Sequence, residues 1–120
     1  VGDWVIVGGI TGVHQFVHIG AHAMTGAGTT QLQDLPPFVM CNGNPAQPHG
    51  MNLEGLKRRG FSAQSLQVLR RAYKTLYKEG HTAAEAIDAL KALALAHPEA
   101  AEHVHTLADF VQGSKRGIVR

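Results

Sequence analysis

A six-residue repeat runs through the first third of the chain. From Val1 the sequence divides into VGDWVI, VGGITG, VHQFVH, IGAHAM, TGAGTT and QLQDLP. The first column is aliphatic in the first four hexads, and the second is glycine in most of them. A strand repeats every two residues and a helix about every 3.6, so a period of six fits neither as an isolated element. The pattern is typical of a solenoid of very short parallel strands.

The repeat is short for a free-standing solenoid. Three hexads close one triangular coil, so the segment holds about two coils, whereas solenoids need about three repeats to bury a continuous core. The chain also opens at Val1 inside the repeat, with no methionine and no cap. We therefore expect it to be the C-terminal part of a longer protein.

Composition excludes several classes of protein. A net charge of +2 over 120 residues does not by itself favour nucleic-acid binding. Cys41 is the only cysteine, so no intrachain disulfide can form and a reducing compartment is the simpler expectation. No apolar run approaches the roughly 20 residues that span a bilayer. We predict a cytoplasmic protein with no membrane span.

The repeat ends at Pro36 and Pro37, which cannot donate ladder hydrogen bonds. A stretch rich in Asn, Gly and Pro follows, and after it the pattern becomes helical. We predict the last coils of the solenoid at 1–37, a connecting loop at 38–50 and a C-terminal helical domain at 51–120. The fold class is β plus α.

Start and stop signals predict three or four short helices in the second half. Ser62 suits an N-cap, and Thr82 with Glu85 forms a capping box. Pro98 suits the first turn of the last helix. The expected ends are Gly60, Gly80, about Ala96 and Gly113, and the expected apolar faces carry Leu66, Leu69, Tyr73 and Leu76, then Ile87 and Leu90, then Val104, Leu107 and Val111.

His14, His18 and His22 are spaced by four, which on a helix would align three metal ligands. The hexad frame places them in three different columns, so we predict no metal site. His14 stands in the column that other hexads fill with glycine. Two interpretations remain open: a tolerated substitution at a roomy corner, or a histidine that lines a cleft between subunits together with Gln15.

The stretch NLEGLKRRG is the second candidate site. A helix start offers free backbone donors, and the adjacent Arg58 and Arg59 have a geometry suited to phosphate oxygens. Asn52 and Glu54 could contact the polar edges of a sugar or base. The alternative is a solvated basic turn, since the following helix carries a cationic stripe on its wet side. No nucleophile motif, paired carboxylates or P-loop stand out.

Three segments resemble a known family: VGGITGVHQFVHIGAHAM, QDLPPFVMCNGNPA and above all GMNLEGLKRRGFS. They are similar to the C-terminal half of the acyl-[acyl-carrier-protein]–UDP-N-acetylglucosamine O-acyltransferases, which open lipid A biosynthesis. The resemblance covers the whole chain, including the closing SKRGIVR. It implies a homotrimer of left-handed parallel β-helices, with active sites between subunits and no cofactor or metal.

The resemblance also implies a reaction. An (R)-3-hydroxyacyl chain moves from acyl carrier protein to the 3-hydroxyl of UDP-N-acetylglucosamine. His14 and Gln15 would face the sugar nucleotide, and Asn52 and Glu54 its nucleoside. Arg58 and Arg59 would bind its phosphates or the carrier protein. No catalytic residue is expected in this chain, because the family's general-base histidine belongs to a coil that precedes Val1, so the chain alone is expected to be inert.

Two positions bear on specificity in that family. Ala27 lies in the hexad that measures acyl length, often with glycine there. Pro45 stands where some members carry a ligand-contacting histidine, so one recognition element is missing. Two alternatives remain: another hexapeptide acyltransferase that uses coenzyme A donors, or a non-enzymatic trimerising module that binds an acidic partner.

Overall fold

The structure is a computed structural model that describes residues 1–120, and the chain divides into two compact units. Val1–Asn52 and Ser114–Arg120 form the first, which we call the coil unit. Leu53–Gly113 form the second, the helical unit. No helix in either is long and apolar enough to cross a membrane.

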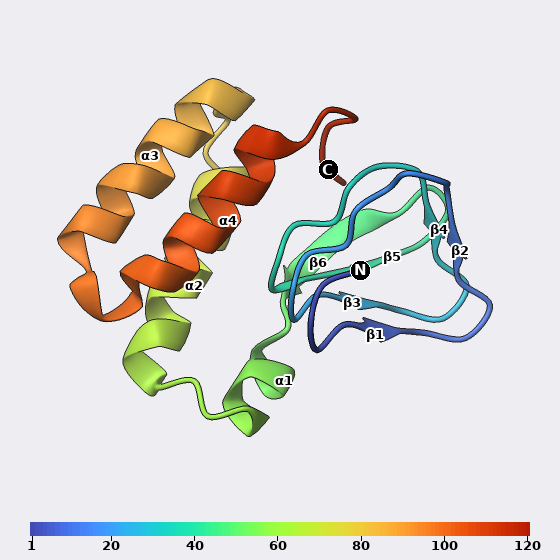
Figure 1. Cartoon of the computed structure of the whole chain (residues 1–120), viewed down its shortest axis with the longest axis horizontal. Coiled ribbons are helices and arrows are strands. Elements are labelled where there is room, and N and C mark those ends of the chain that lie inside the picture. Colours follow the sequence, from blue (N-terminus) through green and yellow to red (C-terminus); the bar gives the residue numbers. More distant parts are fainter. The chain divides into compact units, whose positions relative to one another are not determined.

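Short parallel strands build the coil unit (Figure 1). They are β1 (Ile6–Val7), β2 (Gly12–Val13), β3 (Met24–Thr25) and β4 (Thr30–Gln31). β1 pairs with β3 and β2 with β4, so that Ile6 faces Met24 and Gly12 faces Thr30, 18 positions later in each case. Eighteen residues are three hexads, which confirms the coil length predicted from the repeat.

The fourth column of the hexads turns the corners of the coils. Its residues have left-handed backbone conformations, which cost a non-glycine residue roughly 1–2 kcal/mol each. In the first five hexads they are Trp4, Ile10, Phe16, His22 and Gly28; the next left-handed corner after these is Phe38, ten positions on, and φ lies between 57° and 74° at all six. Backbone hydrogen bonds between coils stabilise the corners: the amides of His22, Gly28 and Phe38 donate to the carbonyls of Asp3, Gly9 and Ala21.

The sheet of the coil unit continues through residues 38–50, where the sequence predicted a connecting loop. β5 (Val39–Asn42) pairs parallel with β3, and β6 (Gln47–Met51) pairs antiparallel with β5. The prolines did not end the sheet, because they lie at a corner where no ladder donor is needed. A Cβ on Gly20 would collide with Pro37, so glycine is required under this corner.

The end of the chain also departs from the predicted domain limits, since residues 114–120 return to the coil unit. Ile118 forms a parallel bridge with Asp34. The Asp34 amide donates to the Gly117 carbonyl at 3.0 Å, and the Val119 amide donates to the Asp34 carbonyl at 2.8 Å. We call residues 114–120 the C-terminal strap.

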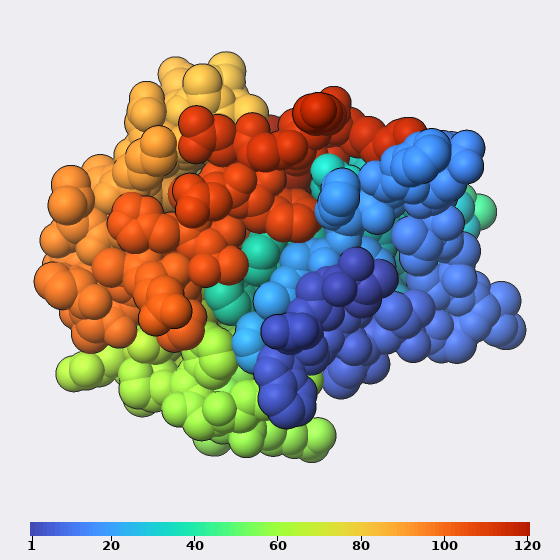
Figure 2. Space-filling view, in the orientation of Figure 1, coloured from blue at the N-terminus to red at the C-terminus, as the bar shows by residue number.

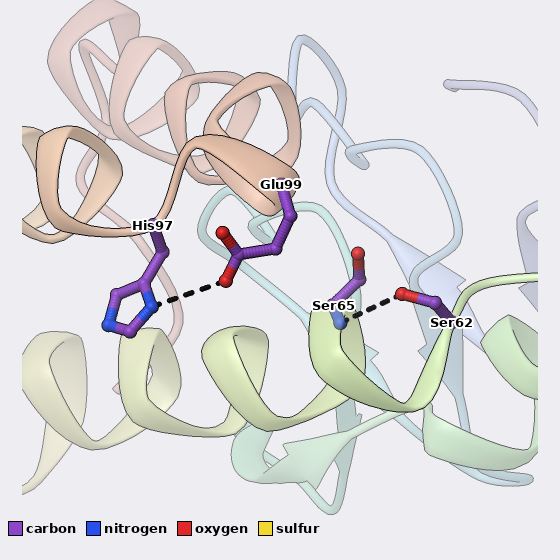
Figure 3. Close-up of polar contacts among 4 residues, drawn as sticks. All are labelled: Ser62, Ser65, His97 and Glu99. Carbon is purple, nitrogen blue, oxygen red and sulfur yellow. Dashed lines mark hydrogen bonds and ion pairs between the residues drawn. The ribbon is translucent and has the colours of Figure 1, made fainter.

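The helical unit contains α1 (Leu53–Arg58), α2 (Ala63–Tyr77), α3 (Ala83–Ala96), the 3₁₀ turn η1 (Pro98–Ala100) and α4 (Ala101–Gly113). The caps predicted at Ser62 and Thr82 are present: Ser62 accepts from the Ser65 amide at 3.1 Å (Figure 3), and Thr82 and Glu85 form the capping box. At η1, His97 Nδ1 lies 3.3 Å from a Glu99 carboxyl oxygen (Figure 3).

Apolar faces of α2, α3 and α4 form the core of this unit. Its fully buried side chains include Leu69, Ala72, Leu76, Leu90, Val104 and Leu107. Leu66, Tyr73 and Ile87 were expected to be buried with them but are half-exposed. On α2 the buried stripe instead takes in Val68 and Ala72, so the packed face is rotated from the one that the larger side chains suggested.

Candidate functional site

The coil changes length beside His14. Val13 faces Gln31, 18 positions later, whereas Ile19 faces Leu35, only 16 positions later. The five residues 14–18 therefore lie against only three, 32–34. We call residues 14–18 the wide turn. It closes with a hydrogen bond from the Val17 amide to the His14 carbonyl at 3.3 Å, and it exposes both His14 and Gln15.

The wide turn explains why a histidine fits a column of glycines. A Cβ on Gly8 would come within 2.7 Å of backbone atoms of the next coil. The His14 amide makes the same bond to the next coil as Gly8 does, donating to the Gln31 carbonyl at 2.9 Å. We attribute the room for its side chain to the two residues missing from the coil it faces.

The shorter facing segment, residues 32–34, also determines how the imidazole ring of His14 is oriented. In other coils the third-column carbonyls of Asp3, Gly9 and Ala21 accept from an amide of the next coil. The corresponding carbonyl of Gln15 instead lies 2.9 Å from His14 Nδ1. A carbonyl only accepts, so Nδ1 carries the proton, and in the neutral ring Nε2 is left as a hydrogen-bond acceptor.

Asn52 and Ala27 lie elsewhere in the coil unit. Asn52 is 4% exposed, and its Nδ2 donates to the His22 carbonyl at 3.0 Å, so part of its side chain is engaged in holding the chain to the coil. Ala27 is exposed beside the corner at Gly28, two corners after the wide turn along the chain. A single chain therefore does not bring Ala27 and His14 together at one corner.

Glu54 and Arg58 lie four residues apart on one face of α1, and both are exposed. No ion pair forms between them. Arg59 follows the helix and is half-exposed. The sequence predicted one phosphate site made of the backbone amides at a helix start and the adjacent arginines. In α1 these groups lie at opposite ends of the helix, because Lys57 and Arg58 are in its last turn.

A groove of about 410 Å³ runs between α1 and α2. One face of α2 contributes residues spaced by three and four, which include the half-exposed Leu66. The lining residues are Leu53, Glu54 and Lys57 of α1, with Ala63, Leu66, Gln67 and Arg70 of α2. Of the residues proposed from the sequence, only Glu54 lines this groove.

Two features were missed by the sequence analysis. One is the groove, which depends on how α1 and α2 pack. The other is Asp34, a buried side chain that contacts both the wide turn and the C-terminal strap. The only signal for it was in the sixth hexad, where the aliphatic column resumes two positions early, at Leu35. His14, His18 and His22 do not converge, and no group of three His, Cys, Asp or Glu could hold a metal ion.

Comparison with known proteins gives relatives over the whole chain. An acyl-[acyl-carrier-protein]–UDP-N-acetylglucosamine O-acyltransferase of Thiobacillus denitrificans is 57% identical over 122 residues, covering 100% of this chain and 45% of the relative. The protein of the same name from Burkholderia lata is 53% identical over 120 residues and is covered to 46%. The chain thus spans about half the length of the curated relatives it matches.

Solved structures similar to this chain come from the same family as the curated relatives. LpxA from Acinetobacter baumannii superposes with a TM-score of 0.92 at 44% identity, covering 99% of this chain and 45% of that one. The UDP-N-acetylglucosamine O-acyltransferase (LpxA) from Moraxella catarrhalis gives 0.93 at 38% identity, covering 100% and 45%. The family described as "Udp N-acetylglucosamine O-acyltransferase; Domain 2" matches residues 34–119. The chain therefore belongs to the UDP-N-acetylglucosamine O-acyltransferase family.

Proposed function

We propose that this chain is the C-terminal, substrate-binding part of an enzyme that moves an (R)-3-hydroxyacyl chain from acyl carrier protein to the 3-hydroxyl of UDP-N-acetylglucosamine, the first step of lipid A biosynthesis. The observation that carries the proposal is 57% identity, over 100% of this chain and 45% of the relative, to a protein named for those two substrates. We place the protein in the cytoplasm.

His14 and Gln15 bind and orient the sugar in this proposal. The contact from His14 Nδ1 to the Gln15 carbonyl holds the ring, so its Nε2 is directed to accept from a sugar hydroxyl or, in the charged form, to donate. The resemblance assigns the general base to a histidine in an earlier coil of the full-length protein. The role of His14 is therefore orientation of the acceptor hydroxyl, and proton removal belongs to that other residue.

The residues of α1 bind the nucleotide end. Glu54 and Arg58 share one exposed face, with Arg59 next in the chain. The carboxylate accepts from hydroxyl or ring N–H groups, and guanidinium groups pair with phosphate oxygens in a fork. Asn52, whose Nδ2 donates to the His22 carbonyl, contacts the nucleoside in this proposal. Pro45 has no side-chain donor with which to replace the histidine of other members.

A homotrimer of left-handed coils completes the site. Ala27 and His14 lie at different corners of one chain, so a cleft between subunits is the arrangement that would bring acyl groove and sugar site together. Large apolar side chains are also exposed on the first coil, which lies at the surface in blue in Figure 2: Ile10 is 96% and Phe16 76% exposed. Apolar surface of this kind is typical of an interface.

The test is acyl transfer by the full-length protein. We expect turnover with (R)-3-hydroxyacyl carrier protein and UDP-N-acetylglucosamine, and none with acetyl or succinyl coenzyme A. Gln15→Ala and His14→Ala should each raise KM for the sugar nucleotide while leaving KM for the acyl donor nearly unchanged. Turnover with coenzyme A donors alone would replace this proposal with that of a different hexapeptide acyltransferase.

A further inference from the structure

The shortened coil leaves one backbone amide of the wide turn without its usual partner. In the sixth column of the hexads, the amides of Ile6 and Gly12 donate to the carbonyls of Ala23 and Thr29 in the next coil, 17 positions later. The amide of His18 occupies the same column. It donates instead to a side chain, the carboxyl oxygen Oδ1 of Asp34, at 2.8 Å.

Both carboxyl oxygens of Asp34 accept hydrogen bonds, one from the wide turn and one from the C-terminal strap. Asp34 is 2% exposed, and its second carboxyl oxygen accepts from the Ser114 hydroxyl at 2.6 Å. Its own amide donates to Gly117, whereas the amides at equivalent corners donate to the preceding coil. One buried residue therefore takes over the backbone bonds that the coil lacks, and it fastens the C-terminal strap to the wide turn.

The strap also contacts the wide turn from outside. The Arg116 guanidinium lies 6.0 Å from the centre of the Phe16 ring, within the range of a cation–π contact. Phe16 is the left-handed residue of the turn, with φ of 66°, and it directly follows Gln15. The conformation of the turn is thus constrained by Asp34 at one end and by Arg116 at its apex.

We propose that Asp34, with Ser114 of the strap, is a positioning residue for sugar-nucleotide binding: it holds the wide turn so that His14 and Gln15 present their side chains to the acceptor. The inference rests on the proposed function of those two residues. Asp34 itself touches no substrate. Without its Oδ1, the His18 amide has no backbone acceptor, and the turn relaxes toward other conformations.

The experiment compares Asp34→Ala, Asp34→Asn and Ser114→Ala in the full-length protein. Asp34→Ala should raise KM for UDP-N-acetylglucosamine by about ten-fold, the scale of one hydrogen bond to a charged group, with little change in KM for the acyl donor. Asp34→Asn keeps one acceptor oxygen for the His18 amide, so it should recover most of the affinity. Ser114→Ala keeps the His18 bond and the backbone bonds of the strap but removes the side-chain bond from the strap to Asp34, so its effect should fall between the other two.

Two controls separate positioning from general destabilisation. Ser62→Ala removes the N-cap bond of α2 in the helical unit and should lower the melting temperature without changing KM for the sugar nucleotide. Hydrogen–deuterium exchange of a peptide spanning residues 13–19 should speed up in Asp34→Ala and stay slow in Asp34→Asn and Ser62→Ala.

The outcomes are distinguishable. If Gln15→Ala and His14→Ala raise KM for the sugar nucleotide but no Asp34 or Ser114 variant does, the positioning role is overturned and the proposed function stands. If Gln15→Ala and His14→Ala have no effect, the assigned sugar contacts are wrong and this inference falls with them. If Asp34→Ala does not fold, an unchanged KM in both Asp34→Asn and Ser114→Ala, with unchanged exchange at residues 13–19 in Ser114→Ala, would also overturn it.

Discussion

The side chain of Asp34 accepts a 2.8 Å hydrogen bond from the backbone amide of His18, where other coils use a backbone carbonyl. Three features of the coil unit follow from the same two-residue shortening. It makes room for a side chain at His14, it leaves the Gln15 carbonyl to the His14 ring, and it creates the place for Asp34. A corner that exposes His14 and Gln15 arises from a local change in coil length, while the strand pairing on either side of it is kept.

Oligomerisation is the first prediction. The full-length protein should sediment as a trimer at micromolar concentration. Ile10→Asn should shift it toward smaller species, because it removes an almost fully exposed apolar side chain at a left-handed position that Asn tolerates better than Ile.

Leu95→Gln is the matched control, since Leu95 is also exposed but lies on α3 in the helical unit. A stable monomer of the unsubstituted protein at these concentrations would contradict the trimer. Equal effects of the two substitutions would remove Ile10 from the interface.

The second prediction concerns the arginines of the NLEGLKRRG segment. Replacing Arg58 and Arg59 by Ala should weaken binding of UDP-sugar or carrier protein by about 1.5–3 kcal/mol for each charged hydrogen bond lost. Arg71→Ala, an exposed cation on α2 outside the groove, is the control for net charge. Unchanged Michaelis constants for both substrates in the double variant would refute the assignment.

Acyl-length selection at Ala27 is the third prediction. An added methylene at the floor of a close-packed acyl groove costs about 1–3 kcal/mol, so Ala27→Met should shorten the preferred chain by several carbons and Ala27→Gly should lengthen it modestly. The measurement is the ratio of kcat/KM for carrier-protein donors of different acyl length. The same length preference in all three proteins would show that Ala27 does not measure the chain.

The fourth prediction is a pH dependence at the start of α3. Hydrogen bonds from the backbone and side chain of Thr82 hold the pKa of the Glu85 carboxyl below its ordinary value of 4.5. Because the folded-state pKa is the lower one, the stabilisation is fully present above pH 4.5 and is lost as pH falls through the folded-state value. Melting temperatures of Glu85→Gln and of the unsubstituted protein should therefore converge in acid. A gap that is independent of pH would contradict the linkage.

Reactivity of Cys41 is the fifth prediction. Burial in β5 raises the pKa of its thiol to about 11, and the thiolate is the reactive form. A disulfide reagent at pH 8 should leave the folded protein unlabelled and should label one thiol after denaturation. A Cys41→Ser protein carrying Gln64→Cys, exposed on α2, should react at once. Rapid labelling of native Cys41 would show that its strand opens.

Local stereochemistry made a large part of this structure predictable from the sequence. The hexad columns predict an 18-residue coil because inward side chains and tight corners recur at fixed spacing. Ser62, Thr82 with Glu85, and Gly113 mark helix ends, since caps satisfy backbone groups within three or four residues. His14, Gln15, Glu54 and Arg58 are exposed, and their roles stay predictions.

Only the tertiary structure decided the change in coil length, the strands within residues 38–50, the buried amide of Asn52 and the return of the C-terminal strap to Asp34. Each depends on which backbone groups meet across long separations, such as the 80 positions between Asp34 and Ser114. In the sequence the shortened coil leaves only a shift of the aliphatic column, at Leu35, and that shift does not say which group replaces the missing partner. The hydrogen bonds that compensate for it come from wherever the folded chain brings a donor or acceptor within reach.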